Sequence, residues 1–300
     1  MIVRITYLKY IPVLSAIRIR ILCGLKLSEK FITGLKTGKK MEGGARIKGI
    51  EKKSEPDLPL ITIITVVLNG EKYIEQTFKS VFGQTYSNIE YIVIDGNSTD
   101  KTIDIIRQYE NKIDYWQSEK DKGIYFAMNR GISLAKGELI GILNADDYFS
   151  KDTVMLVADA YLKTKADVFH GDILLITEGK ETRMQPDITK MDQQPSVFHP
   201  TCFVRKSVYD AIGVFDTKYK ISSDYDFLLR CLKKNYKFHY IPEVLSHFRP
   251  GGMSASCASN IEGYKIMKVH QTGHHRSVIV RGIKCYVKTF LKKVINLKNK

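Results

Sequence analysis

The chain has 300 residues, of which 44% are hydrophobic, so it is long enough to bury one large core. Its formal charge of +15 lies at the two ends: residues 1–53 hold 13 Lys and Arg against 3 Asp and Glu, residues 261–300 hold 10 against 1, and the span between them holds 24 against 28. A slightly acidic middle, and ends without a recognisable nucleic-acid-binding module, argue against nucleic acid as a partner.

The two basic ends are predicted to be amphipathic segments that flank a main domain. Within residues 2–27, Arg and Lys interrupt every apolar run, so neither a membrane span nor a signal peptide is predicted there. Residues 278–294 again thread apolar side chains among Arg and Lys. We expect an anionic membrane surface as their partner, with a helix docked on its own domain as the alternative. The predicted organisation is a basic flank and linker over 1–59, a main domain over 60–260 and a basic amphipathic tail over 261–300.

The cysteines indicate the compartment. Their number is five, their spacing is wide, and no Cys-x-x-Cys pair occurs. A reducing cytosol is therefore expected, without a zinc site.

The main domain is predicted to begin with alternating strands and helices. Residues 60–68 form an almost continuous β-branched run that is typical of a central strand. After the Asn69-Gly70 turn, residues 71–82 carry apolar side chains at helical spacing. A second strand over 91–94 precedes the polar loop 95–100 and a second helix. This order predicts parallel pairing through right-handed crossovers, so the loops that follow the strands share one edge of the sheet.

A third helix is predicted over 124–135, and the strand after it ends in the most informative stretch of the chain. The apolar run 139–143 passes directly into Asn144-Ala145-Asp146-Asp147. Carboxylates at the carboxyl end of a parallel strand lie where open α/β sheets bind ligands, and their oxygens suit Mg²⁺ or Mn²⁺. The alternative is an Asp-rich turn that binds nothing.

The acidic loops together predict a site for a nucleoside diphosphate and its metal, with Asp95 placed to meet the nucleotide. No Gly-x-Gly-x-x-Gly or Walker sequence occurs, so backbone amides are not expected to surround the phosphates. The metal must then neutralise more of the diphosphate charge. A nucleotidyltransferase is one alternative, but it usually has a Gly-rich basic loop after its first strand, which residues 67–71 are not. A membrane-docked, non-catalytic glycan-binding protein is another.

Two later residues are candidates for the site. Arg249 precedes Gly251-Gly252, so a mobile loop there would bring a guanidinium to the diphosphate and exclude water; the alternative is a turn with a surface Arg. His199 either contacts an acceptor or is buried at the start of a strand.

Four motifs, in this order, resemble those of family 2 glycosyltransferases, with the similarity covering roughly residues 60–254. The motifs are Thr65-Val66-Val67-Leu68-Asn69, Val93-Ile94-Asp95-Gly96-Asn97-Ser98-Thr99-Asp100, Asp121-Lys122-Gly123-Ile124-Tyr125-Phe126-Ala127-Met128-Asn129 and Asn144-Ala145-Asp146-Asp147. The resemblance is closest to the bacterial branch that builds capsular, exopolysaccharide and O-antigen repeat units. It implies a GT-A fold, which is an α/β fold with a mostly parallel sheet between helices, and it implies a nucleotide-sugar donor, a divalent metal and inversion at the anomeric carbon. With Arg249 added, the expected donor-binding residues are Thr65, Val66, Asn69, Asp95, Asp121, Asp146 and Arg249.

The same resemblance assigns the metal ligands and the base. Asp147 is the implied direct ligand, with Asp146 turned toward the ribose or a metal-bound water. Inversion requires a base that removes the proton of the acceptor hydroxyl, and residues 221–230 match the acidic motif that carries it, which implies Asp224. The alternative for Asp224 is a helix N-cap. Asp226 is expected to support this loop or the helix dipole, with acceptor contact as the alternative.

Two departures from the family pattern limit what is carried over. Gly96 stands where a second Asp is common, so the UDP-sugar usual in the family is expected while guanine and thymine nucleotides stay open. His247 lies a few residues before a His that helps to hold the metal in some relatives, so a packed or hydrogen-bonded histidine is expected rather than a ligand. The predicted activity is glycosyl transfer of the hexosyl type to a lipid-linked oligosaccharide, at the cytoplasmic face of a bacterial membrane.

Overall fold

The computed structural model describes residues 40–177, 179–251 and 256–272. The amphipathic segments predicted within 2–27 and 278–294 lie outside these residues. Among the described residues, no helix has the length and apolar character needed to cross a membrane.

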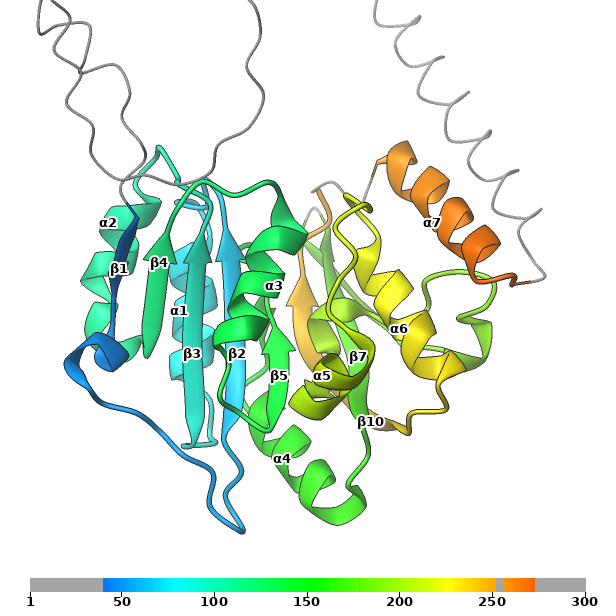
Figure 1. The fold of residues 1–300 in the computed structure, drawn as a ribbon, viewed down its shortest axis with the longest axis horizontal. Helices are drawn as coiled ribbons and strands as arrows, with labels where there is room; N and C mark the ends of the chain where they lie inside the picture. The colour runs from blue at the N-terminus through cyan, green and yellow to red at the C-terminus, as the bar shows by residue number, and fades with distance from the viewer. Residues whose placement is uncertain (1–39, 178, 252–255, 273–300) are drawn as a thin grey trace, which may run out of the picture. The chain divides into compact units, whose positions relative to one another are not determined.

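The main domain alternates strands and helices and ends in a helical region (Figure 1). Its α-helices are α1 (Ile74–Phe82), α2 (Thr102–Gln108), α3 (Ile124–Leu134), α4 (Thr153–Thr164), α5 (Lys206–Ile212), α6 (Ser223–Lys233) and α7 (Cys257–Val269). Its strands are β1 (Met41–Gly43), β2 (Ile61–Val67), β3 (Ile89–Asp95), β4 (Tyr115–Ser118), β5 (Leu139–Ile142), β6 (Tyr148–Phe149), β7 (Val168–Thr177), β8 (Lys180–Met184), β9 (Phe203–Arg205) and β10 (Phe238–Phe248). Short 3₁₀ helices are η2 (Ala45–Lys48), η3 (Glu110–Lys112), η4 (Ile188–Lys190) and η5 (His199–Thr201).

One sheet runs through the domain in the order β1-β4-β3-β2-β5-β9-β7-β10-β6, with β8 paired to β7. Strands β4, β3, β2 and β5 are parallel, which confirms the predicted central sheet. The antiparallel strand β9 joins β5 to β7. Because β2, β3 and β5 point the same way, the residues that follow them meet at one edge, as the right-handed crossovers require.

Helices cover both faces of the sheet. In β2, Ile64 and Val66 face a core shared with α3, α5, α6 and α7. Ile61 and Ile63 face the opposite core, which α1, α2 and α4 complete. Side chains alternate along a strand, so a strand buried on both faces carries apolar and β-branched side chains throughout, which explains the run over residues 61–67.

One described strand lies before the predicted main domain, and one described helix crosses its predicted end. Strand β1 precedes residue 60 and pairs with β4, whose Trp116 is buried. Helix α7 crosses residue 260 and packs on α6 through Ile266 and Met267.

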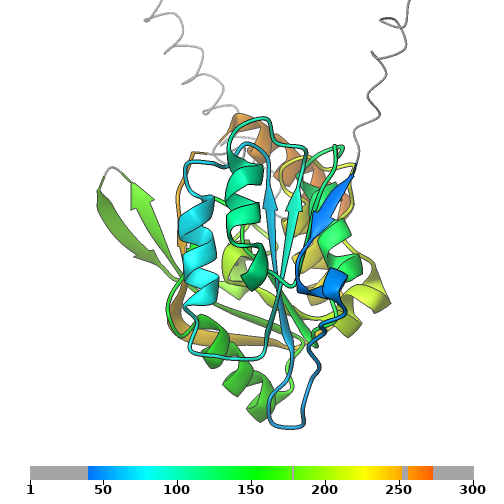
Figure 2. The same ribbon diagram turned by 90° about the vertical axis from the view of Figure 1, so that its left-hand side faces the viewer.

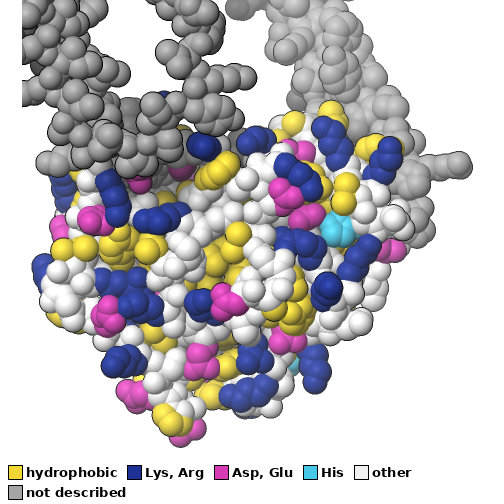
Figure 3. Space-filling view, in the orientation of Figure 1, with side chains coloured by type: hydrophobic (Ala, Val, Ile, Leu, Met, Phe, Trp, Pro, Cys, Tyr) yellow, Lys and Arg dark blue, Asp and Glu magenta, His cyan; other side chains and the backbone are white. Residues whose placement is uncertain are grey.

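Two surface features complete the domain. The β7–β8 hairpin projects beyond the other elements, as Figure 2 shows at its left. On the face shown in Figure 3, Lys and Arg are interspersed with Asp and Glu over the described residues rather than gathered in one basic patch.

Candidate active site

The edge at which β2 and β5 end opens into a cavity of about 940 Å³. This volume lies in the upper part of the range for small-molecule sites. The predicted residues that line the cavity are Val66, Asn69, Asp146, His199, Asp224 and Arg249. The predicted residues that do not line it are Thr65, Asp95, Asp121, Asp147 and Asp226.

The turn after β5 carries the two adjacent carboxylates. The N–H of Asp147 donates to the Asn144 carbonyl at 3.1 Å, which closes the turn. The Asp147 side chain is fully buried: its Oδ1 accepts the Arg249 N–H at 3.1 Å, and its Oδ2 has no hydrogen-bond partner among the described residues. Burial raises the pKa of both carboxyls, and the charge of Asp146 raises that of Asp147 further.

These carboxylates fit a divalent cation. A bound cation would favour their charged forms, which burial disfavours, and would supply a partner for the buried Asp147 oxygen. Across the ranges that the structure describes, no cluster of three His, Cys, Asp or Glu side chains could hold a metal. A site with few protein ligands suits Mg²⁺ or Mn²⁺, because such ions are commonly held by one or two carboxylates together with water and substrate phosphate.

Arg249 is fixed beside this pair. Its guanidinium carbon lies 4.6 Å from the ring centroid of Tyr73 and 5.0 Å from that of Tyr148. The guanidinium also donates to the Asp146 carbonyl and to the Gln76 side chain. These contacts hold a positive charge at the cavity wall next to the carboxylates, where a diphosphate would benefit from it.

Asp224 lies on another part of the cavity wall, in the first turn of α6. The N-cap of this helix is Ser222, so Asp224 is not the cap. The Tyr125 hydroxyl donates to Asp224 Oδ1 at 2.8 Å and lies 2.7 Å from the Ile221 carbonyl. Burial, followed by the charge of Asp224, raises the pKa of Tyr125 well above its usual value, which keeps this hydroxyl protonated as a donor. The prediction had missed Tyr125, although it lies inside the third motif.

The loop before Asp224 is held by α7. Glu262 accepts the backbone N–H groups of Lys220 at 2.7 Å, Ile221 at 2.8 Å and Ser222 at 3.0 Å. One carboxylate on α7 therefore satisfies three consecutive amides just before the candidate base. Local sequence patterns do not identify Glu262 as a partner of this loop, because it lies about 40 residues further along the chain.

Asp226 lies in the first turn of α6 and does not line the cavity. It is buried, and its carboxylate oxygens lie 3.0 Å from Arg230 Nε and 2.9 Å from His270 Nε2. Burial alone would raise the pKa of Asp226, but the hydrogen bonds from His270 and Arg230 outweigh it and lower that pKa. The contact with Arg230 lies within α6, and the hydrogen bond with His270 ties the start of α6 to the residue that follows α7.

Thr65 and Asp95 lie behind the cavity wall. Thr65 is buried and accepts the Tyr91 hydroxyl at 2.9 Å. Asp95 is also buried, and its carboxylate accepts the N–H groups of Asn97 and Ser98 and the hydroxyls of Ser98 and Ser118. Asp95 thus accepts three hydrogen bonds from its own loop, which it shapes into a tight turn, and a fourth from Ser118 at the end of β4.

Asp121 lies beside Gly96. A Cβ added at Gly96 would come within 2.9 Å of Asp121 Oδ2. Burial raises the pKa of Asp121, the N–H of Gly123 opposes this by donating to its Oδ1 at 2.8 Å, and the charge of Asp95 raises it again. A second Asp at position 96 would add another negative charge against this carboxylate.

The two candidate histidines differ in position. His199 lines the cavity and packs edge-on against Phe215, and burial lowers its pKa even though the charge of Asp224 opposes the shift. His247 stacks on Tyr148 with ring centroids 4.3 Å apart, and its Nε2 lies 3.2 Å from the Ser150 hydroxyl. His247 is therefore a packed and hydrogen-bonded residue.

Relatives of known name share this domain. A PGL/p-HBAD biosynthesis glycosyltransferase of Mycobacterium bovis is 29% identical over 179 residues, which are 58% of this chain and 70% of that protein. An uncharacterized glycosyltransferase of Mycobacterium tuberculosis is 34% identical over 179 residues, or 57% of this chain and 68% of that protein.

Solved structures confirm the predicted GT-A fold. Residues 1–349 of TarS from S. aureus, in complex with UDP-GlcNAc, align with a TM-score of 0.58 at 19% identity, over 75% of this chain and 71% of that one. The mannosyltransferase PcManGT from Pyrobaculum calidifontis, in complex with GDP-Man and Mn²⁺, aligns with a TM-score of 0.56 at 17% identity, over 77% and 67%.

The family follows from the sequence match. The model of the family described as Glycosyl transferase family 2 matches residues 62–218, which is more than half of the chain. This match selects glycosyl transfer over nucleotidyl transfer and over non-catalytic glycan binding. The chain belongs to glycosyl transferase family 2 and is a glycosyltransferase.

Proposed function

We propose that the protein moves a sugar from a nucleoside-diphosphate sugar to a hydroxyl of a glycan acceptor, with inversion at the anomeric carbon. The observation that carries this proposal is one cavity with Asp146 and Asp224 on different parts of its wall. Inversion needs a base on the face of the sugar opposite the leaving diphosphate. Two separate carboxylates, one for the diphosphate side and one for the acceptor side, meet that requirement.

The donor nucleotide would lie at the ends of β2 and β5, where Val66 and Asn69 line the cavity. Thr65 and Asp95, which do not line the cavity, would fix the shape of its wall. Asp121 would contribute to the donor site from its position beside Gly96. Among the solved relatives, TarS binds UDP-GlcNAc and PcManGT binds GDP-Man. We propose a UDP-sugar first and a GDP-sugar second.

The metal proposed here is Mg²⁺ or Mn²⁺, held by Asp146 and Asp147 with the donor diphosphate; PcManGT was solved with Mn²⁺. Such a cation, when bound, would stabilise the charge that develops on the leaving diphosphate. Because Asp146 lines the cavity and Asp147 is buried behind it, we reverse the division of roles expected from the sequence. Asp146 would be the metal ligand that faces the cavity. Asp147 would hold the turn through its backbone N–H and offer its unpaired buried oxygen to the same cation. Arg249 would bind the same diphosphate.

Asp224 is the proposed base. Tyr125 donates to its Oδ1, which orients the carboxylate and leaves Oδ2 for the proton of the acceptor hydroxyl. Asp224→Asn should keep donor binding and lower turnover by roughly 10²- to 10⁴-fold, the usual range for general base catalysis. Asp210→Asn, on the exposed side of α5, is the matched control. Near-normal turnover of Asp224→Asn would remove this residue from the role.

The acceptor proposed is a lipid-linked oligosaccharide of a surface polysaccharide, such as capsule, exopolysaccharide or O-antigen, at the cytoplasmic face of the membrane. Support comes from the basic ends of the chain, which suit anionic lipid head groups. Deleting residues 273–300 keeps α7 intact and should reduce sedimentation with anionic vesicles, whereas neutral vesicles serve as the control. Undiminished sedimentation would contradict this part of the proposal.

The decisive experiment for the donor is a thermal-shift screen of UDP, GDP, dTDP and CMP, each with and without Mn²⁺. A ligand that binds only the folded state stabilises it by about 2.7 kcal/mol at a concentration of 100 Kd. We expect one nucleoside diphosphate to raise the melting temperature in the presence of Mn²⁺. If none does, the proposed donor site is wrong.

A further inference from the structure

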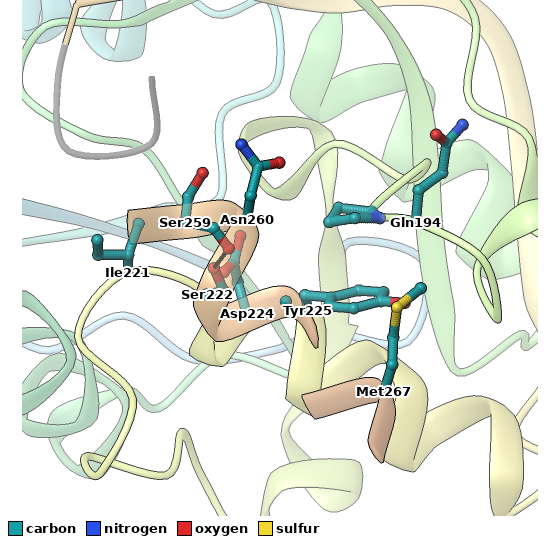
Figure 4. Close-up of a pocket in the computed structure, with 10 residues that line it drawn as sticks. Gln194, Ile221, Ser222, Asp224, Tyr225, Ser259, Asn260 and Met267 are labelled. Carbon is teal, nitrogen blue, oxygen red and sulfur yellow. Dashed lines mark hydrogen bonds between the residues drawn. The ribbon is translucent and has the colours of Figure 1, made fainter. Parts of the chain in front are cut away.

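A second pocket of about 190 Å³ lies between α6 and α7 (Figure 4). It shares Pro195, Ile221 and Asp224 with the main cavity. The proposed base is therefore accessible from two sides, and the donor-side carboxylate Asp146 lines only the main cavity.

The wall of this pocket combines polar and apolar side chains. Ser259 and Asn260 project from α7, with Gln194 on the far side and Tyr225 and Met267 below (Figure 4). Hydroxyl and amide groups pair with the hydroxyls of a sugar, and flat apolar surfaces pack against its C–H groups. The Asn260 amide has no hydrogen-bond partner within the described part of the chain.

A glycine keeps this pocket open. Gly263 lies in the middle of α7 and lines the pocket, and a Cβ added there would meet nothing within 4 Å. Glycine weakens a helix interior relative to alanine. Here no neighbouring atom would clash with a larger side chain, so close packing does not require glycine at this position of α7. The glycine leaves part of the pocket that Asp224 also lines unfilled.

The pocket is also preformed. Glu262, adjacent to Gly263, holds the amides of residues 220–222, of which Ile221 and Ser222 line the pocket. The Tyr225 hydroxyl donates to the Met191 carbonyl at 2.6 Å, which fixes the ring at the base of the pocket. A pocket whose side chains are already fixed loses little conformational entropy when a ligand binds. A weakly bound ligand can therefore still occupy it.

We propose that the α6–α7 pocket binds the acceptor, and that its occupant is a hydroxyl-bearing sugar ring of the acceptor glycan. This inference rests on the proposed function. The donor would occupy the main cavity beside Asp146, the acceptor ring would enter from the α7 side, and the two would meet at Asp224. The acceptor hydroxyl would give its proton to Asp224 as its oxygen forms the bond to the anomeric carbon. The bond from that carbon to the diphosphate breaks, and the diphosphate leaves with the electron pair.

The test uses octyl glycosides of glucose, galactose, mannose and N-acetylglucosamine as probes. Binding of each to the full chain is measured by calorimetry in the presence of Mn²⁺ and the nucleoside diphosphate that stabilises the protein. Gly263→Leu fills the pocket, and Asn260→Ala removes its amide. Lys265→Ala, on the exposed side of α7, is the control. Nucleotide binding and the melting temperature are recorded for every variant, so a folding defect is recognised separately.

We expect one glycoside to bind the wild type and Lys265→Ala equally, and Gly263→Leu and Asn260→Ala at least tenfold more weakly. The melting temperature of Gly263→Leu should be unchanged or higher, because leucine favours the helix. Nucleotide affinity should be the same in all variants. A glycoside that binds Gly263→Leu as well as the wild type would overturn the inference, and so would nucleotide binding without binding of any glycoside. Absence of nucleotide binding to the wild type would instead overturn the proposed function.

Discussion

Glu262 offers the most direct test of how the structure positions the proposed base. Its carboxylate accepts three backbone N–H groups: Oε1 accepts that of Lys220, and Oε2 accepts those of Ile221 and Ser222. Asp224 follows two residues later. Glu262→Ala leaves these amides without their acceptor, and Glu262→Gln keeps a single oxygen to accept them.

The free-energy cost can be estimated from exposure. A hydrogen bond to a charged group contributes about 1.5–3 kcal/mol, and water replaces much of that at exposed amides. Ser222 is buried, Ile221 is half-buried and Lys220 is exposed, so the bond to Ser222 dominates. We expect Glu262→Ala to lower the free energy of unfolding by about 3 kcal/mol, or roughly 6–12 °C in melting temperature for a domain of this size. Glu262→Gln should cost about half as much.

The loss of kcat in Glu262→Ala should exceed the loss that reduced stability alone would cause. A shift of about 1 Å in a reacting group can cost on the order of 100-fold in rate, so kcat of Glu262→Ala should fall by about that factor. The KM for the donor should change less than kcat, because the proposed donor residues Asn69, Asp146 and Arg249 lie outside the loop that Glu262 holds. Turnover is measured below the melting temperature of the variant, with Lys268→Ala on the exposed side of α7 as the control. A variant that is destabilised as expected but keeps kcat within threefold would refute the reasoning, because Tyr125 alone would then hold the loop.

Three further predictions concern the cavity and the core. Asp146→Asn should abolish the stabilisation by Mn²⁺ with a nucleoside diphosphate in a thermal-shift assay; a retained shift would exclude Asp146 from the metal site. Tyr125→Phe should lower kcat by about tenfold with donor affinity unchanged, because Asp224 loses one orienting hydrogen bond worth about 1–2 kcal/mol. Burial lowers the pKa of His170 to about 4 from its ordinary 6.5. The unfolded chain therefore binds the extra proton first, and stability should fall by up to about 3 kcal/mol as the pH drops from 6.5 to 4, a loss that His170→Gln should reduce in urea titrations.

The sequence by itself determined the central part of the fold. The β-branched run of β2, the helical spacing of α1 and the polar loops after β3 and β5 are local patterns, and each was read correctly. Parallel pairing then follows from the order of the elements, because crossovers are right-handed and connect strands that point the same way. The same order brought Asn69 and Asp146 to one edge. The motif around Asp224 identified a carboxylate that lines the same cavity.

Only the tertiary structure decided which carboxylates face the cavity. Asp146 and Asp147 are neighbours in sequence, yet one lines the cavity and the other is buried. Asp95 is occupied by four hydrogen bonds within its loop and with Ser118, which the sequence of that loop does not reveal. A motif gives residue identity, but the direction of a side chain depends on the partners that surround it.

The support of the site also became visible only in the fold. Tyr125 and Asp224 are 99 residues apart, Glu262 and Ser222 are 40 apart, and His270 and Asp226 are 44 apart. Periodicity reports on neighbours within a helix or strand, whereas these contacts depend on how α3, α6 and α7 pack on one core. Helix α7 therefore supports the loop before Asp224 although its sequence begins at the end of the predicted domain, because packing rather than local pattern brings the Glu262 carboxylate to that loop.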